Sequence, residues 1–147
     1  MRRWITISIV VFSIILASSV QAGGLLQKLY FVGLWEGIDA YDGSVAQRSI
    51  TLDSDGKFYI IGQEPYTRGC GGKRGMITGT GVLDGGVLVS EDFTLTCFYP
   101  IDGAIPGPFP NILTVYTPDK LNGTLIESFP DSSNDFPPSV LHKISNR

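Results

Sequence analysis

From residue 33 onward, short stretches rich in Val, Ile, Thr, Tyr and Phe alternate with clusters of Gly, Asp, Asn and Pro. Within the stretches apolar residues tend to recur at every second position, as in FTLTCFY at residues 93–99. A period of two is typical of β-strands, because successive side chains of a strand point to opposite faces. The pattern predicts strands at residues 34–40, 46–52, 57–62, 75–83, 87–90, 93–99, 112–117, 124–129 and 140–144.

Turn sequences separate these strands, among them DSDG at residues 53–56 and DGG at residues 84–86. Short strands with turns every few residues are typical of an antiparallel sandwich or a closed barrel. We favour an all-β, antiparallel up-and-down barrel of about eight strands. Residues 25–32 have the apolar spacing of a short amphipathic helical segment. The proline-rich stretches 100–110 and 129–138 are predicted to be surface loops.

The first 22 residues have the layout of a secretory signal peptide. A basic start, Arg2-Arg3, is followed by an almost wholly apolar run and then by small residues that end at Ala22. A transmembrane anchor is the alternative, but the apolar run is short for a bilayer span, which needs about 20 residues. The pattern predicts a cleaved signal peptide at 1–22, a single barrel domain at 23–147, and a secreted or periplasmic protein without a stable membrane anchor.

The charge balance argues against a nucleic-acid partner. The chain has 11 Lys and Arg against 14 Asp and Glu, and cleavage would remove Arg2 and Arg3 as well. Binding to phosphates requires a basic face, and the sequence has no polybasic patch of the kind that binds membranes. We therefore expect neither partner.

The two cysteines, Cys70 and Cys97, are predicted to form one disulfide. An even cysteine count in an exported protein favours pairing, and closing a loop of about 28 residues would stabilise the fold by about 3.5 kcal/mol. Two cysteines at this spacing do not match a structural zinc site, which needs four clustered ligands. We expect no metal and no cofactor.

The glycine-rich stretch CGGKRGMITGTG at residues 70–81 is not a nucleotide-binding loop. Gly72-Lys73 is followed by Arg74, so the hydroxyl residue of a Walker loop is absent, and Gly79-Thr80-Gly81 lacks the third glycine of the dinucleotide fingerprint. No helix is expected behind it to bind a phosphate. The stretch predicts a turn at residues 69–75 and then a strand whose glycines permit close packing or a bend.

Two turn sequences also have functional interpretations. Asp53-Ser54-Asp55-Gly56 shares its first residues with a calcium loop, but Lys57 and the flanking strands favour a hairpin turn. Asn122-Gly123-Thr124 fits an N-glycosylation acceptor as well as a hairpin turn.

The sequence offers little for catalysis. Its one histidine is His142, and no nucleophile elbow or histidine cluster for a metal is present. Acidic residues cluster at Glu36, Asp39 and Asp42. Glycoside chemistry would require a cleft that brings Glu36 or Asp39 within about 5–10 Å of another acid. We expect a protein that is not an enzyme.

Gly33-Leu34-Trp35 at the start of the first strand resembles the G-x-W motif of the calycin group, which includes the lipocalins and the avidin-like proteins. The resemblance implies a small antiparallel barrel in which Gly33 and Trp35 are structural, with the tryptophan ring closing one end. The lipocalin T-D-Y motif is absent, and no arginine near the last strand matches the family residue that packs on the tryptophan.

We therefore expect an exported, non-enzymatic binding protein for a small apolar or aromatic ligand in a barrel cavity. The candidate cavity residues are Trp35, Phe58, Ile60, Tyr66 and Phe98. The alternative is a protein-binding module, such as a periplasmic inhibitor or an envelope-associated factor. Its contact surface would be the loops 100–110 and 129–138, with Ile105, Phe109 and Phe136.

Overall fold

The structure, a computed structural model of the chain, describes residues 24–98, 108–131 and 136–146. These residues fall into a short unit that ends at Tyr30 and a barrel unit that begins at Phe31. Residues 24–31 are helical, as expected. No helix in these three ranges has the length and apolarity needed to cross a membrane. The predicted signal peptide lies outside the described residues.

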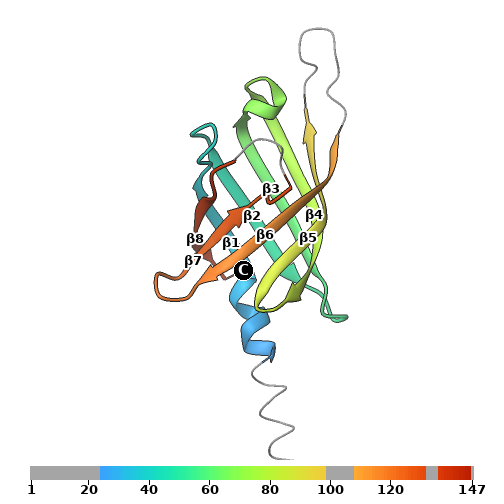
Figure 1. The fold of residues 1–147 in the computed structure, drawn as a ribbon, viewed down its shortest axis with the longest axis vertical. Helices are drawn as coiled ribbons and strands as arrows, with labels where there is room; N and C mark the ends of the chain where they lie inside the picture. The colour runs from blue at the N-terminus through green and yellow to red at the C-terminus, as the bar shows by residue number, and fades with distance from the viewer. Residues whose placement is uncertain (1–23, 99–107, 132–135, 147) are drawn as a thin grey trace, which may run out of the picture. The chain divides into compact units, whose positions relative to one another are not determined.

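Eight antiparallel strands close into a barrel, which confirms the predicted fold class (Figure 1). Each strand pairs with its neighbours in sequence, and β1 pairs with β8 to close the ring. The strands are β1 (Gly33–Ile38), β2 (Val45–Leu52), β3 (Phe58–Thr67), β4 (Lys73–Asp84), β5 (Val87–Cys97), β6 (Phe109–Asp119), β7 (Thr124–Ser128) and β8 (Ser139–Ser145).

The period of two correctly assigns the faces of the strands. In β3, Phe58 and Ile60 are buried in the barrel, whereas Tyr59 and Ile61 on the outer face are 41% and 55% exposed. The pattern works here because antiparallel strands of a closed barrel have one inner and one outer face.

Strand β5 is longer than the sequence pattern predicts. Two strands were expected, with a break at Glu91-Asp92, but β5 is continuous and its pairing with β6 shifts register between Ser90 and Phe93. The Asp92 carboxylate accepts hydrogen bonds from the backbone N–H and the hydroxyl of Thr80, both at 2.6 Å. These bonds hold a polar, turn-like sequence against β4, so the chain does not turn.

The prediction of a loop at 100–110 is wrong at its C-terminal end, because Phe109 and Pro110 begin β6. A proline is tolerated at the start of a strand, where its missing N–H removes no essential ladder bond. Pro108 is not in a strand, and residues 100–107 lie outside the described residues. The described residues of the second predicted loop, 129–131 and 136–138, are not in strands, as expected.

The glycine-rich stretch is a disulfide-anchored turn followed by a strand. A short 3₁₀ helix, η1 (Arg68–Cys70), ends at Gly71, which has a left-handed backbone (φ 61°). Cys70 is bonded to Cys97 at the end of β5, as predicted. A Cβ added to Gly75 would lie 2.7 Å from Leu95 Cδ1, so this glycine of β4 permits the close packing that was expected.

One end of the barrel is filled by side chains around Trp35, which is 1% exposed. Its ring N–H donates a hydrogen bond of 2.7 Å to the carbonyl of Phe31, and the ring of Phe31 packs edge-on against Phe58. The Lys143 ammonium of β8 lies 4.8 Å from the Trp35 ring centroid. Gly33 has φ +142° and faces the Ser145 carbonyl so closely that a Cβ would clash. We call this the tryptophan end.

Candidate functional site

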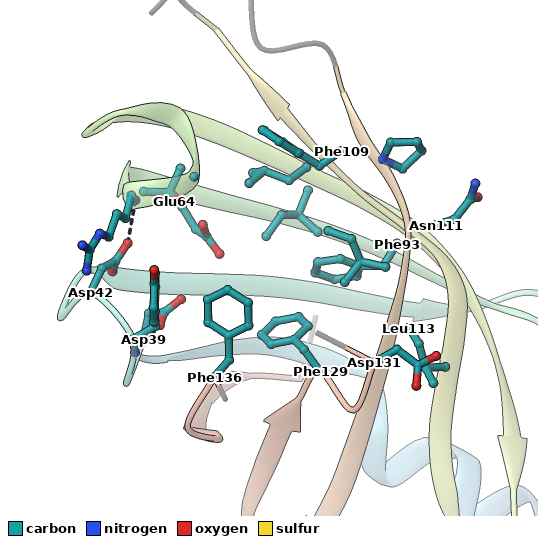
Figure 2. A pocket seen from close by; sticks show the side chains of 18 of the residues that line it. Asp39, Asp42, Glu64, Phe93, Phe109, Asn111, Leu113, Phe129, Asp131 and Phe136 are labelled. Carbon is teal, nitrogen blue, oxygen red and sulfur yellow. Dashed lines mark hydrogen bonds between the residues drawn. The ribbon is translucent and has the colours of Figure 1, made fainter. Parts of the chain in front are cut away.

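A pocket of about 790 Å³ occupies the end of the barrel opposite the tryptophan end (Figure 2). It lies where β3, β5 and β7 end and where β4 and β6 begin. Its apolar lining includes Ile77, Phe93, Leu95, Ile112, Phe129 and Phe136. The barrel is therefore neither completely filled nor hollow along its whole length.

The inner faces of three consecutive strands supply one wall of the pocket. Ile77 comes from β4, Phe93 from β5 and Ile112 from β6, and Phe93 is paired with Ile112 across the sheet. Gly79 of β4 lies against the Cα of Phe93, since an added Cβ would be 3.2 Å from it. Closely packed strands of this kind hold the wall in a fixed shape.

Four aromatic rings form a continuous row along the pocket. Tyr41 contacts Phe136 with ring centroids 4.4 Å apart, Phe136 and Phe129 are 6.2 Å apart, and Phe129 and Phe93 are 5.9 Å apart. The ring planes of the first two pairs are inclined by 77° and 75°, the edge-to-face arrangement that aromatic pairs prefer, and those of Phe129 and Phe93 are tilted by 59°. We call Tyr41, Phe136, Phe129 and Phe93 the aromatic row.

A buried charge cluster lies inside the barrel beside the pocket. Arg48 of β2 is completely buried and donates two hydrogen bonds, of 2.7 and 2.9 Å, to the two carboxylate oxygens of Glu127. It donates a third, of 2.8 Å, to Glu64, and a fourth to the carbonyl of Gln47. The Arg48 guanidinium also lies 5.8 Å from the ring centroid of Phe93, so the cluster contacts the pocket wall directly.

Burial and neighbouring charges shift the pKa values of this cluster. Burial acts to lower the pKa of Arg48, but the Glu127 and Glu64 carboxylates outweigh it and raise that pKa above its ordinary value. Burial raises the pKa of Glu64, and the charges of Glu127 and Asp39 act in the same direction. Arg48 therefore stays charged, whereas Glu64 protonates more readily than an ordinary glutamate despite the opposing charge of Arg48.

The acidic residues at the end of β1 differ in their protonation. Burial, together with the charges of Asp42 and Glu127, raises the pKa of Asp39. Burial also acts to raise the pKa of Asp42, but hydrogen bonds from the N–H groups of Ser44 and Arg68 outweigh it and lower that pKa. Figure 2 shows Asp42 and Asp39 near each other at the edge of the pocket, where Asp42 accepts a hydrogen bond of 2.8 Å from the Arg68 backbone N–H.

Comparison with known proteins identifies no relative of this chain. No family model matches it, and no curated protein sequence or solved structure matches at a significant level. The function is therefore inferred from the site itself rather than from descent.

None of the five residues predicted to bind a ligand lines this pocket. Trp35, Phe58 and Ile60 point into the barrel but are buried, with Trp35 and Phe58 packed at the tryptophan end. Tyr66 and Phe98 are 49% and 52% exposed outside the pocket. Their proposed role in ligand binding stays a prediction, whereas the pocket offers a different set of residues.

Several residues noted in the sequence for other reasons do meet at the pocket. Phe109 and Phe136, which the protein-binding hypothesis placed on contact loops, both line it. Asp39 and Asp42 line it too, whereas Glu36 is on the outer face of β1 and accepts a hydrogen bond from Gln47. Phe93 belonged to a recognised strand, so its inward position was predictable, but its contact with a pocket was not.

Among the described residues that line the pocket there is no histidine and no cysteine. The one histidine, His142, is exposed on β8, and both cysteines are in the disulfide. Within the described ranges no three His, Cys, Asp or Glu residues are grouped so as to hold a metal ion. The pocket therefore combines a large apolar surface with carboxylates.

Proposed function

We propose that this protein is an exported, non-enzymatic binding protein that holds a small ligand with an apolar or aromatic body in the pocket of its barrel. The observation that carries the proposal is the pocket of about 790 Å³ with its aromatic row. Ligand sites are typically clefts of about 300–1,000 Å³ lined mainly by apolar and aromatic side chains with a few polar groups.

The two ends of the barrel differ in a way that supports this proposal, since one is packed with side chains and the other contains the pocket. The tryptophan end is closed by packed side chains, with Trp35 and Phe58 almost completely buried. A ligand would therefore enter at the opposite end, where the pocket lies. It would stop above the buried cluster of Arg48, Glu64 and Glu127, called the Arg48 cluster below.

Membership of the calycin group is part of the proposal. The eight-stranded closed barrel and the buried Trp35 behind Gly33 are consistent with the resemblance. Lys143 of β8 lies over the Trp35 ring, where the family has an arginine, and a lysine supplies the same positive charge.

Export to a secreted or periplasmic location also remains a proposal. The signal-peptide pattern of residues 1–22 supports it. The Cys70–Cys97 disulfide adds support, because disulfides form and persist mainly in oxidising compartments.

The protein-binding alternative has less support. Phe109 and Phe136 line the pocket, and Phe136 packs against two rings of the aromatic row. Aromatic side chains engaged in this way account for the apolar character of their loops without a protein partner. Ile105, the third residue of that hypothesis, lies outside the described residues.

We expect a neutral aromatic probe, N-phenylnaphthylamine, to bind and to gain fluorescence on transfer from water to the pocket. Ile112→Trp, which fills the pocket from β6, should weaken this binding at least about tenfold, equivalent to about 1.4 kcal/mol. The matched control is Ile144→Trp, the same change at a position of β8 that is 53% exposed. It should leave the affinity unchanged. A fluorescence titration measures the affinity of the wild type and of both variants for the probe. Equal affinities for the wild type and Ile112→Trp would contradict the proposal.

A further inference from the structure

The charged side chains that line the pocket are mainly acidic. Four carboxylates line it, those of Asp39, Asp42, Glu64 and Asp131, and among the described lining residues only Arg68 is basic. The Arg68 guanidinium is already engaged, since it lies 5.3 Å from the centroid of the Tyr41 ring. A ligand that enters the pocket therefore meets an excess of negative charge.

Glu64 is the carboxylate built most deeply into the site. It is 5% exposed, and its Oε1 accepts a hydrogen bond of 2.8 Å from Arg48. Its Oε2 has no hydrogen-bond partner in the described part of the chain. Figure 2 shows the Glu64 carboxylate pointing from β3 into the pocket. This second oxygen is therefore available to a ligand that donates a hydrogen bond to it or brings a positive charge, and such charge-assisted bonds are the stronger ones.

Within the Arg48 cluster, the negative charge of Glu64 is not fully compensated. Arg48 is the one cation of the cluster, and it is shared between two carboxylates, with both oxygens of Glu127 and one of Glu64 bonded to it. One guanidinium cannot neutralise two carboxylates, so the cluster carries a net negative charge on the side where Glu64 meets the pocket.

The aromatic row also favours cations. The face of an aromatic ring is electronegative and attracts a positive charge within about 6 Å of the centroid. Both ends of the row already show this attraction, with Arg48 at 5.8 Å from Phe93 and Arg68 at 5.3 Å from Tyr41. The rings between them, Phe129 and Phe136, are in the pocket lining.

We propose that the pocket selects organic cations, in which an amine or ammonium group lies against Glu64 and Asp39 and an apolar body packs on Phe129 and Phe136. This inference rests on the proposed binding function and adds the charge of the ligand. An organic cation fits better than a metal ion, because the described residues contain no cluster of three metal ligands and most of the lining is apolar.

A charge series on one aromatic body tests the proposal. The probes are naphthylmethylamine, which is protonated at neutral pH, its neutral analogue naphthylmethanol, and the anion naphthoate. Isothermal titration calorimetry of the full barrel should show that the ammonium probe binds about ten times more tightly than the alcohol. The carboxylate should bind most weakly.

Two variants identify the carboxylates responsible. Glu64→Gln keeps the shape and an oxygen that can accept from Arg48, but it removes the charge. It should reduce the preference for the ammonium over the alcohol to about threefold or less. Asp39→Asn provides a second variant in case Glu64→Gln disturbs the cluster. The matched control is Asp55→Asn in the β2–β3 turn, outside the pocket lining, which removes the same charge and should keep the full preference.

The outcomes separate this proposal from the proposed function. Equal affinities for the three probes, or tightest binding of naphthoate, would overturn the preference for cations and leave ligand binding intact. An equal loss of preference in Asp55→Asn would assign the effect to net charge and would overturn the role of Glu64 and Asp39. Failure of all three probes to bind would overturn both proposals.

Discussion

Arg48→Met should lower the free energy of unfolding by about 3–5 kcal/mol at neutral pH, the usual cost of removing one partner from a buried ion pair. The side chains of Glu127 and Glu64 are only 1% and 6% exposed, and Arg48 is their ion-pair partner. Methionine fills much of the space but cannot compensate two buried carboxylates. Urea denaturation followed by circular dichroism measures the loss.

The pH dependence of the loss distinguishes charge from packing. Burial already raises the pKa of Glu64 in the folded wild type, and the loss of Arg48, whose charge lowers that pKa, should raise it further. Folding of the variant then takes up protons, so the variant gains stability as pH falls through this raised pKa. The difference from the wild type should shrink on acidification. A difference that is independent of pH would assign the loss to packing.

A charge-free version of the cluster is the control for this variant. Arg48→Met combined with Glu64→Gln and Glu127→Gln buries no ionised group. It should regain a substantial part of the lost stability, because uncompensated charge rather than a missing side chain is what makes the single change costly. A triple variant that is less stable than Arg48→Met would contradict this explanation.

Trp35→Ala should destabilise the barrel by about 3–5 kcal/mol, the range for removing a large buried aromatic side chain. The change removes the packing at the tryptophan end and the hydrogen bond of 2.7 Å to the Phe31 carbonyl, and it also removes the ring beneath Lys143. Thermal and urea unfolding measure the loss. Leu121→Ala, at a position that is 97% exposed, is the control and should change stability by less than about 0.5 kcal/mol.

Milder variants divide this effect into its parts. Trp35→Phe keeps an aromatic ring but removes the hydrogen bond from the Trp35 ring N–H to the Phe31 carbonyl, which should cost about 1–3 kcal/mol. Lys143→Met removes the charge over the ring, a contact that contributes about 0.5–1 kcal/mol at an exposed site. Because Trp35 does not line the pocket, Trp35→Phe should leave the affinity for N-phenylnaphthylamine unchanged. A large loss of affinity would instead support the role predicted for Trp35 from the sequence.

The fold was largely predictable because its pattern is local. Alternation in β3 correctly assigned Phe58 and Ile60 to the inside, and the glycines of the Asp53–Gly56 and Asp84–Gly86 segments marked hairpins, with positive φ at Gly56 and Gly85. The error in β5 arose because Glu91-Asp92 resembles a turn in sequence. The hydrogen bonds from Thr80 that keep it in the strand come from another part of the chain.

The site was much less predictable, because it depends on depth within the barrel. Alternation gives the face of a strand but not which end of the barrel a residue occupies. Phe58 and Phe93 both point inward, yet Phe58 packs at the tryptophan end and Phe93 lines the pocket. The Arg48 cluster joins β2, β3 and β7, whose residues are far apart in sequence. No local sequence motif predicts contacts between residues so far apart.

The strand order also bears on how the molecule assembles. Every strand pairing except β1–β8 joins neighbours along the chain, so each hairpin can form from a local segment, at a small cost in loop-closure entropy. The β1–β8 pairing, which we call the seam, joins the two ends of the barrel sequence. It therefore has a larger cost in loop-closure entropy than the hairpins. Gly37 lies in this seam, as does the contact of Lys143 with Trp35. The tryptophan motif thus lies at the strand pairing with the greatest separation along the chain, where Trp35 and Lys143 help to hold the two ends of the barrel sequence together.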